Sequence, residues 1–339
     1  MSGLPSSVIM LTEGLFDLSG KGGRPDQQMP RISYEERKMK QLIDEIKTMA
    51  REQDAVILAH YYVDGEVQDI ADYVGDSFFL AKKAKEVQNK TIVFCGVTFM
   101  GESACILNPD KTVLIPDADA VCPMALMVER EKIAEMREKY EDLAVVCYIN
   151  SMAATKELVD VCVTSSNALK IVKNLPQKNI YFIPDKNLGS WIAEQVPEKN
   201  FILGDGYCHV HDCITPEDIE EYRAKYPGCK VLVHPECPLT VSKMADYVGS
   251  TSGIIDYATE SPDKEFIVGT EAGVLHELKR KNPDKEFHFI EKAACEDMHR
   301  MTLEDVAACL RENSPKAELD EGVRQRAEAS LDRMLELAK

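Results

Sequence analysis

The sequence lacks the features that would place it in a membrane or on nucleic acid. No uninterrupted apolar run approaches the roughly 18 residues that a transmembrane helix requires. Lysine and arginine total 40 against 58 aspartates and glutamates, so the net charge is −18. This charge repels the phosphates of nucleic acid and anionic lipid. We therefore expect a protein that binds neither nucleic acid nor a membrane.

The sequence also lacks the local cysteine spacings of common redox and zinc folds. Its cysteines number 11, an odd count, and no two of them form a CxxC pair. This excludes zinc-ribbon, thioredoxin-like and bacterial-ferredoxin motifs. Residues 1–31 have neither the basic segment nor the long apolar segment of a secretory signal. We expect a cytoplasmic protein with reduced thiols, in which any cysteine site is assembled from distant segments.

No Walker A motif and no complete GxGxxG motif is present, so a nucleotide cofactor has no support. The composition is ordinary for a globular protein, with 45% apolar and 29% charged residues. A chain of 339 residues is long enough for two or three domains. We expect most of it to fold.

What the sequence does contain is an internal repeat. The segment ADYVGD at residues 71–76 recurs as ADYVGS at 245–250, and NPDK at 108–111 recurs at 282–285. Both offsets are 174 residues. A related segment, PEK at 197–199, lies near the midpoint, 88 residues after Pro109 and 86 before Pro283. The repeat therefore occurs three times with a period of about 87 residues, too long for the usual solenoid repeats.

Strand and helix patterns alternate within each repeat. In the first repeat we expect strands at 55–59, 74, 92–94 and 112–115, and helices at 66–73, 78–87, 99–107 and from about 124. Such alternation predicts parallel sheets flanked by helices. The expected fold class is α/β, with three homologous doubly wound parallel-sheet domains related by pseudo-three-fold symmetry around a central active site.

The repeat also predicts the domain boundaries. We expect a flexible extension at 1–34, a first α/β repeat with its leading helix at 35–140, a second at 141–227, a third at 228–314, and a C-terminal helix at 315–339 that packs on the domains.

Three of the cysteines follow the repeat. Cys122, Cys208 and Cys295 are spaced by 86 and 87 residues, each shortly after the last strand of its repeat. Under three-fold symmetry their sulfurs would point at one axis and leave one face open. Two groups suit such a site: zinc with a bound water, or a 4Fe-4S cluster with one iron that has no protein ligand. Either would supply a Lewis acid.

The remaining cysteines have no such spacing, and we interpret them as small buried apolar groups. They are Cys95, Cys105, Cys147, Cys162, Cys213, Cys229, Cys237 and Cys309. His276, His288 and His299 likewise have no equivalent in the other repeats, and we expect surface or core roles for them.

Hydroxyl side chains also recur with the repeat. Ser77, Ser165 and Thr251 are spaced by 88 and 86 residues, each at the predicted start of a helix. Helix N-termini favour anions, because their free N–H groups and their dipole attract negative charge. These loops therefore predict binding of small molecules that carry carboxylate or phosphate groups.

Polar residues mark the strand ends, where parallel sheets bind ligands. The first strand of each repeat ends at His60, Tyr148 or His234, again with steps of 88 and 86 residues. Tyr62, His211 and Glu236 lie close to these positions or to a registered cysteine. One pocket could thus hold several acid–base groups.

Seven segments resemble the quinolinate synthase family: AHYYVDGEVQDIADYVGDS, FCGVTFMGESACILNPDK, CYINSMAATKELVDVCVTSSNA, PDKNLG, GYCHVHD, HPECP and ADYVGSTSGII. The resemblance covers residues 35 to 339. It implies a 4Fe-4S cluster held by Cys122, Cys208 and Cys295, with its open iron as a Lewis acid. It further implies condensation of iminoaspartate with dihydroxyacetone phosphate, with loss of phosphate and water, to give quinolinate for NAD biosynthesis. Functional coupling to an iminoaspartate-producing enzyme follows from the same resemblance.

The resemblance also assigns roles to individual residues. The positions matching substrate-contacting or proton-transfer groups are His60, Tyr62, Tyr148, Asn150, His234 and Glu236. Ser77, Ser165 and Thr251 match anion-binding loops, and His211 matches the family histidine after the second cluster ligand. Our hypothesis is that Glu236 and Tyr62 move protons, and we count His211 and Tyr148 as further catalytic groups.

Two other functions stay open at this point. Other three-cysteine iron–sulfur enzymes, such as the diphthamide-forming radical enzyme and hydroxymethylbutenyl diphosphate reductase, use redox or radical chemistry. A non-enzymatic cluster-based sensor would expose a similar cluster but needs a partner surface.

Overall fold

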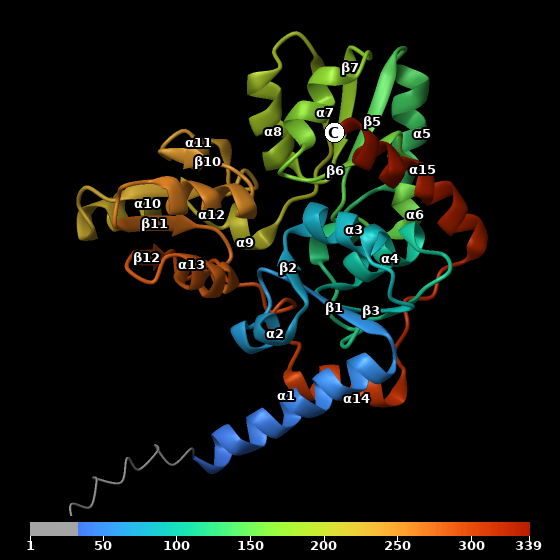
Figure 1. Cartoon of the computed structure of the whole chain (residues 1–339). Coiled ribbons are helices and arrows are strands. Elements are labelled where there is room, and N and C mark those ends of the chain that lie inside the picture. The colour runs from blue at the N-terminus through green and yellow to red at the C-terminus, as the bar shows by residue number, and fades with distance from the viewer. Residues whose placement is uncertain (1–32) are drawn as a thin grey trace, which may run out of the picture. The chain divides into compact units, whose positions relative to one another are not determined.

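The computed structural model describes residues 33–339, so almost all of the predicted extension lies outside the described residues. Three four-stranded parallel sheets, one per repeat, follow one another along the chain (Figure 1). The strand orders are β2-β1-β3-β4, β6-β5-β7-β8 and β10-β9-β11-β12, the same pattern three times. The predicted α/β class with three repeated parallel sheets is confirmed.

The strands are short and match the predicted apolar runs. The first sheet contains β1 (Ala55–His60), β2 (Tyr73–Gly75), β3 (Thr91–Cys95) and β4 (Thr112–Leu114). The second contains β5 (Leu143–Tyr148), β6 (Val161–Val163), β7 (Asn179–Ile183) and β8 (Asn200–Leu203). The third contains β9 (Lys230–Val233), β10 (Tyr247–Val248), β11 (Glu265–Gly269) and β12 (Glu286–Phe289).

Helices connect these strands. In the first repeat they are α2 (Gly65–Ile70), α3 (Ser77–Glu86) and α4 (Thr98–Leu107), preceded by α1 (Tyr34–Glu52). The second repeat has α5 (Arg130–Lys139), α6 (Ala153–Lys156), α7 (Ala168–Asn174) and α8 (Lys186–Gln195). Then follow α9 (His209–Asp212), α10 (Pro216–Lys225), α11 (Leu239–Ser242), α12 (Thr251–Glu260), α13 (Leu275–Lys281), α14 (Leu303–Glu312) and α15 (Glu321–Leu337). Within residues 33–339, no helix is both long and apolar enough to cross a bilayer.

Two details of the first repeat differ from the prediction. The helix expected from about residue 124 is a short 3-10 helix, Pro123–Leu126, and the α-helix begins only at Arg130. The helix expected over 66–73 ends at Ile70. It stops there because Asp72 turns back to accept a hydrogen bond from the Ile57 N–H, and Tyr73 pairs with β1.

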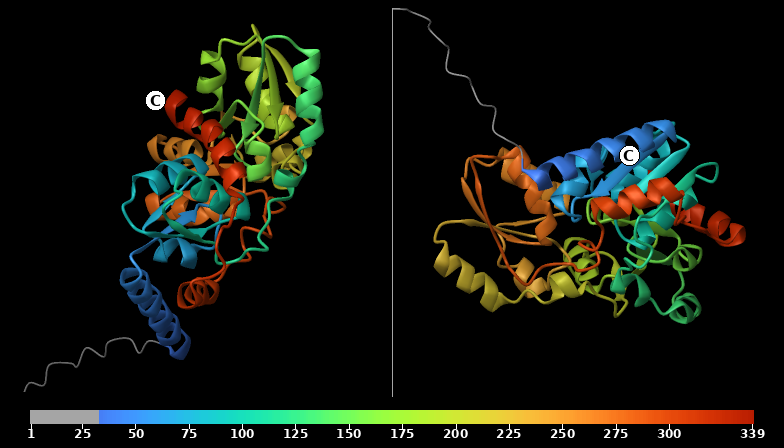
Figure 2. Two further views of the ribbon diagram at one scale, coloured as in Figure 1. Left: turned by 90° about the vertical axis from the view of Figure 1, so that its right-hand side faces the viewer. Right: turned by 90° about the horizontal axis from the view of Figure 1, so that it is seen from below.

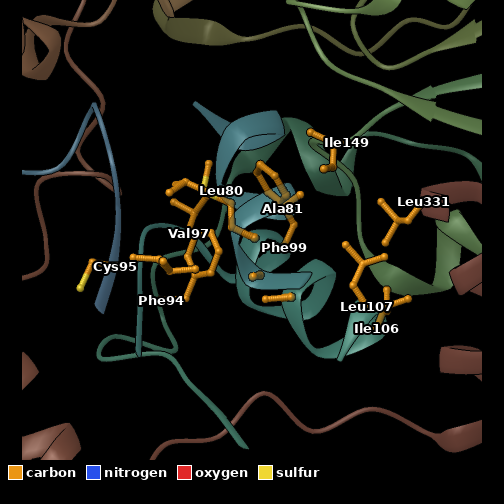
Figure 3. Packing of buried hydrophobic residues seen from close by; sticks show 14 of the residues in the cluster. Leu80, Ala81, Phe94, Cys95, Val97, Phe99, Ile106, Leu107, Ile149 and Leu331 are labelled. Atoms are coloured by element: carbon orange, nitrogen blue, oxygen red, sulfur yellow. The ribbon is translucent and has the colours of Figure 1, made fainter. Parts of the chain in front are cut away.

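Central strands are buried on both faces, which is why their sequences are nearly continuous apolar runs. Every residue of β1 and β3 is buried. One apolar cluster joins the first two repeats to α14 and α15. Figure 3 shows this packing, with Leu331 of α15 beside Ile106 and Leu107 of α4. The two faces of the third sheet are covered by two separate clusters.

The C-terminal helix α15 packs across the first two repeats. It contacts α4 of the first repeat and α6, α7 and β6 of the second. Figure 2 shows this helix in red beside the first two repeats. Its apolar stripe includes Ala327, Leu331 and Met334, all buried. These contacts involve elements of two of the three repeats, and the predicted domain boundaries stay a prediction.

The same stabilising contacts recur in each repeat. In each repeat, an aspartate just before the second strand accepts a hydrogen bond from a backbone N–H of the first strand. The pairs are Asp72 with Ile57, Asp160 with Val145, and Asp246 with Val231, at 2.8, 2.7 and 2.9 Å. A lysine before the last strand donates to carbonyls at the end of a preceding helix, namely α3, α7 or α12. These lysines are Lys111, Lys199 and Lys285.

Candidate active site

A cavity lies at the carboxyl ends of the strands and takes its lining from all three repeats. This is where parallel sheets place their ligand sites. The lining includes every residue that the sequence singled out: His60, Tyr62, Ser77, Cys122, Tyr148, Asn150, Ser165, Cys208, His211, His234, Glu236, Thr251 and Cys295. Residues separated by more than 200 positions thus meet in one place because the repeats are arranged around it.

The three registered cysteines occupy loops at this cavity. Cys122 directly precedes the 3-10 helix, Cys208 is the N-cap of α9, and Cys295 follows β12. Burial raises the pKa of Cys122 to about 12 and that of Cys295 to about 11, and it raises the pKa of Cys208 as well. The bare thiols are therefore protonated near neutral pH, and a bound cation would be needed to hold them as thiolates.

The spacing of the three sulfurs bears on the kind of group they could hold. Within residues 33–339, no triad of ligand atoms that all lie within 4.8 Å of one another contains all three cysteines; Cys208 belongs to such a triad with His211 and Glu236. Thiolates on one tetrahedral zinc lie about 4 Å apart, given Zn–S bonds of about 2.3 Å. The wider, all-sulfur set therefore fits a group larger than a single ion, and thiolate donors are those of iron–sulfur clusters.

A carboxylate between histidines forms the acid–base centre of the cavity. Glu236 lies two residues after His234, is 3% exposed, and has an oxygen 2.8 Å from Nδ1 of His211. Burial opposes its ionisation, but the His234 and His211 rings, with hydrogen bonds from His211 and Tyr148, lower the pKa of Glu236 overall. Glu236 is therefore an ionised carboxylate in a buried site.

Two histidines and two tyrosines around Glu236 are neutral. Burial lowers the pKa of both His60 and His234 to about 3, so their imidazoles carry no charge near neutral pH. Burial and the nearby Glu236 charge raise the pKa of Tyr62 and Tyr148 well above 10, so both phenols keep their protons. The site thus places the ionised Glu236 among four neutral hydrogen-bonding side chains.

Comparison with known proteins shows which family the chain resembles. The sequence model of the family described as "Quinolinate synthetase A protein" matches residues 44–336. A quinolinate synthase of Fusobacterium nucleatum is 51% identical over 295 residues, covering 87% of this chain and 99% of the relative. Those of Clostridioides difficile and Caldicellulosiruptor saccharolyticus are 48% and 49% identical, covering 88% and 89% of this chain and 99% of each relative.

The chain belongs to the quinolinate synthase family. The resemblance found in the sequence is confirmed, and the chain is an enzyme.

Two carboxylates that the sequence did not single out hold the cysteine loops of this family member. Asp185 accepts a hydrogen bond from the Cys208 N–H at 2.8 Å, and Glu271 accepts one from the Cys295 N–H at 3.2 Å. Burial, together with Glu236, raises the pKa of Asp185 to about 8. Asp185 and Glu271 occupy equivalent positions in the second and third repeats, but the equivalent residue in the first repeat is Val97. The repeat spacing therefore did not identify a carboxylate at this position.

Thr270 is a further residue that the sequence did not reveal. Its hydroxyl lies 3.0 Å from Nε2 of His211 and 3.0 Å from the hydroxyl of Tyr62, which in turn lies 2.6 Å from the Thr251 hydroxyl. A hydrogen-bonded chain therefore runs from Thr251 through Tyr62 and Thr270 to His211.

The hydroxyl loops partly match the prediction. Ser77 and Thr251 are the first residues of α3 and α12, as expected. Ser165 does not begin a helix, because α7 starts at Ala168; its hydroxyl lies 3.2 Å from Nε2 of His234. The N-caps themselves are Asp76 for α3 and Ser250 for α12.

One buried polar atom in the lining has no partner. The side-chain oxygen of Asn150 makes no hydrogen bond within the described residues, and Asn150 lines the cavity. Buried polar atoms are rarely unpaired in native proteins. An N–H or O–H group of a bound molecule would satisfy this oxygen.

Proposed function

We propose that this enzyme condenses iminoaspartate with dihydroxyacetone phosphate, with loss of phosphate and water, to form quinolinate for NAD biosynthesis. One observation carries the proposal: the three registered cysteines and the acid–base residues of all three repeats line a single cavity. The names of the relatives at about 50% identity support the same product.

Cys122, Cys208 and Cys295 would hold a 4Fe-4S cluster in this cavity. When bound, the cluster supplies a Lewis-acid iron that has no protein ligand. Asp185 and Glu271 position two of the three ligands by fixing the backbone of their loops. In the first repeat, Thr98 has a comparable part, since its hydroxyl donates to the carbonyl of Ala120, two residues before Cys122.

Glu236 is the group best placed to accept a proton from substrate, since it is ionised and buried. A carboxylate in this state can take a proton from carbon next to a carbonyl or imine and return it to a departing hydroxyl. His211 donates a hydrogen bond from Nδ1 to Glu236 at 2.8 Å and so positions this carboxylate, while its Nε2 lies 3.0 Å from the Thr270 hydroxyl. Tyr62 and Tyr148, both protonated, can donate hydrogen bonds to oxygens that gain negative charge.

The substrates carry carboxylates and a phosphate, and the hydroxyl loops suit them. Ser77 and Thr251 begin helices of 10 residues each, where free N–H groups and hydroxyls attract anions. Ser165 and the neutral His234 add a further pair of hydrogen-bonding groups. Asn150 offers its unpaired oxygen to a donor on the substrate. The neutral His60 also lines the cavity beside these groups.

We further propose that the enzyme is cytoplasmic and that a second enzyme supplies its iminoaspartate. Thiols free of disulfides among the described residues agree with a reducing, cytoplasmic setting. Imines hydrolyse in water, so an enzyme that releases iminoaspartate nearby would be its functional partner.

The test is anaerobic purification, with iron and sulfide quantitation, followed by a quinolinate assay that supplies dihydroxyacetone phosphate and a source of iminoaspartate but no reductant. We expect about four irons per chain and turnover without added electrons. A full cluster with no quinolinate formed would favour redox chemistry or a sensor instead. Stoichiometric zinc in place of iron would refute the cluster.

A further inference from the structure

We propose that Cys229, Glu265 and His288 form a zinc site at the amino end of the third sheet, separate from the active-site cavity. Their ligand atoms all lie within 4.8 Å of one another. Oε2 of Glu265 is 3.7 Å from Sγ of Cys229 and 3.4 Å from Nε2 of His288. Tetrahedral zinc with bonds of about 2.0 Å to N or O and 2.3 Å to S has ligand–ligand distances of about 3.3 to 3.6 Å. The observed triangle is close to this size.

The sheet register places the three ligands on one face. In the ladder between β9 and β11, Lys230 pairs with Phe266, so Cys229 lies opposite Glu265. In the ladder between β11 and β12, His288 pairs with Ile267, two residues beyond Glu265. Side chains two residues apart on a strand share a face, so the ligands from three segments converge.

Neighbouring residues fix two of the ligands before any metal binds. Cys229 ends the turn Tyr226-Pro227-Gly228-Cys229, in which its N–H donates to the Tyr226 carbonyl at 3.3 Å. Gly228 has φ +88°, which this turn requires and which side chains rarely adopt. The Tyr226 ring stacks on the His288 ring with centroids 3.6 Å apart. A preformed site loses less conformational entropy when it binds metal.

The other two repeats provide an internal comparison. The residues at the positions of Cys229, Glu265 and His288 are Ala55, Thr91 and Leu114 in the first repeat, and Leu143, Asn179 and Ile202 in the second. None of these six is a usual zinc ligand. The three ligand types therefore gather only in the third repeat, so the shared fold does not by itself require them.

The chemistry of the donors favours zinc over calcium or magnesium. A thiolate, an imidazole and a carboxylate are all zinc ligands, whereas calcium and magnesium take oxygen donors. Cys229 would lose its thiol proton on binding, and the proton would go to solvent. Glu265 and His288 are partly exposed, with 56% and 18% of their side chains accessible, so a water can complete four-fold coordination.

Zinc at this site would join the segment before β9 to β11 and β12. The active-site cavity lies at the opposite ends of the strands, so the metal should stabilise the third repeat without entering the reaction. Cys229 is only half-buried, so the interpretation of it as a small buried apolar group is wrong.

The test uses the tag-free, cluster-loaded protein dialysed against micromolar zinc, followed by metal analysis and zinc K-edge X-ray absorption. We expect about one zinc per chain, with one sulfur at about 2.3 Å and nitrogen or oxygen at about 2.0 Å. Because absorption at the zinc edge is element-specific, iron in the cluster does not interfere. No bound zinc, or zinc bound by three sulfurs as at the active-site cysteines, would overturn the proposal.

Matched variants identify the ligands. Cys229→Ser and His288→Gln should weaken zinc binding at least tenfold and leave quinolinate formation unchanged. The controls are Cys105→Ser and His276→Gln, which alter a half-buried cysteine and a partly exposed histidine elsewhere and should retain the zinc. Glu265→Gln changes an exposed residue at the start of β11 and tests the site even if Cys229→Ser fails to fold. Equal zinc binding in all five variants would refute the assignment.

Discussion

At the amino ends of the strands, apart from the three zinc ligands of the third repeat, the repeats use the same side chains for the same contacts, whereas at the carboxyl ends they share little more than a cysteine and a hydroxyl. The amino ends repeat an aspartate and a lysine, each bonded to backbone in the same way. Even the backbone repeats there: Asp54, Asp142 and Gly228, just before the first strand of each repeat, have φ of 48°, 51° and 88°.

The carboxyl ends differ at equivalent positions. The position two residues past the strand-end residue is Tyr62 in the first repeat, Asn150 in the second and Glu236 in the third. Equivalent positions around the cavity therefore carry a phenol, an amide and a carboxylate. A substrate pair without three-fold symmetry needs three different walls, whereas a cluster held by three cysteines suits three-fold symmetry. The repeats thus separate residues that maintain the fold from residues that perform chemistry.

The largest effect is expected at the registered cysteines, which all three repeats contribute to the cavity. Cys122→Ser should remove the cluster and lower quinolinate formation at least a thousandfold, because two cysteines do not hold it. Iron analysis and the quinolinate assay measure this, with circular dichroism to show that the protein folds. Cys105→Ser, a cysteine of the same repeat outside the register, is the control and should keep both iron and activity.

A residue that differs between repeats should affect the reaction and not the cluster. Glu236→Gln should keep the wild-type iron content and lose about 10²- to 10⁴-fold in turnover, because the amide cannot accept the proton. The measurement is kcat beside iron per chain. Glu277→Gln, which alters another buried carboxylate paired with Arg280, serves as control and should retain turnover. Normal turnover in Glu236→Gln would remove this residue from proton transfer.

Asp185 should behave as a positioning residue. Asp185→Ala removes the acceptor for the Cys208 N–H and the N-cap of α8, a loss of roughly 1 kcal/mol or more for the cap. We expect faster loss of iron on exposure to a chelator, by several-fold, with kcat per cluster little changed. Asp185→Asn keeps an acceptor and should retain iron better than Asp185→Ala. Equal rates of iron loss in the two variants and the wild type would contradict a positioning role.

The smallest effects on activity are expected at the amino ends. Lys285→Met removes charge-assisted hydrogen bonds to carbonyls after α12 and should lower the free energy of unfolding by about 1 to 3 kcal/mol. Lys111→Met and Lys199→Met should act in the same direction, since they make equivalent bonds. Urea unfolding measures the shift, and kcat and iron content should stay at wild-type values. A change in kcat without one in stability would break the comparison between the two strand ends.

The sequence predicted the repeat, the strand positions and the sheet class, because identical segments at one offset and apolar runs are local signals. It also predicted which cysteines, hydroxyls and strand-end groups meet, because equivalent positions in repeats occupy equivalent places. Asp185 and Glu271 were missed, since the repeat position is Val97 in the first copy and carboxylates are common elsewhere. The 3-10 helix after Cys122 was also missed, because its apolar residues resemble the start of an α-helix.

The zinc ligands could not be found from the spacing at all. Cys229, Glu265 and His288 have no counterparts in the other repeats, and only the strand order and register bring them together. Strand order in a parallel sheet depends on crossover connections, which the sequence pattern does not specify residue by residue.

The most direct test of the central claim is Mössbauer spectroscopy of the ⁵⁷Fe-labelled protein with and without dihydroxyacetone phosphate. If the three registered cysteines hold a cluster with one iron open to substrate, one iron of about four should differ from the others and change its spectrum when substrate is added. Four equivalent irons that do not respond to substrate, or no cluster iron at all, would contradict the account.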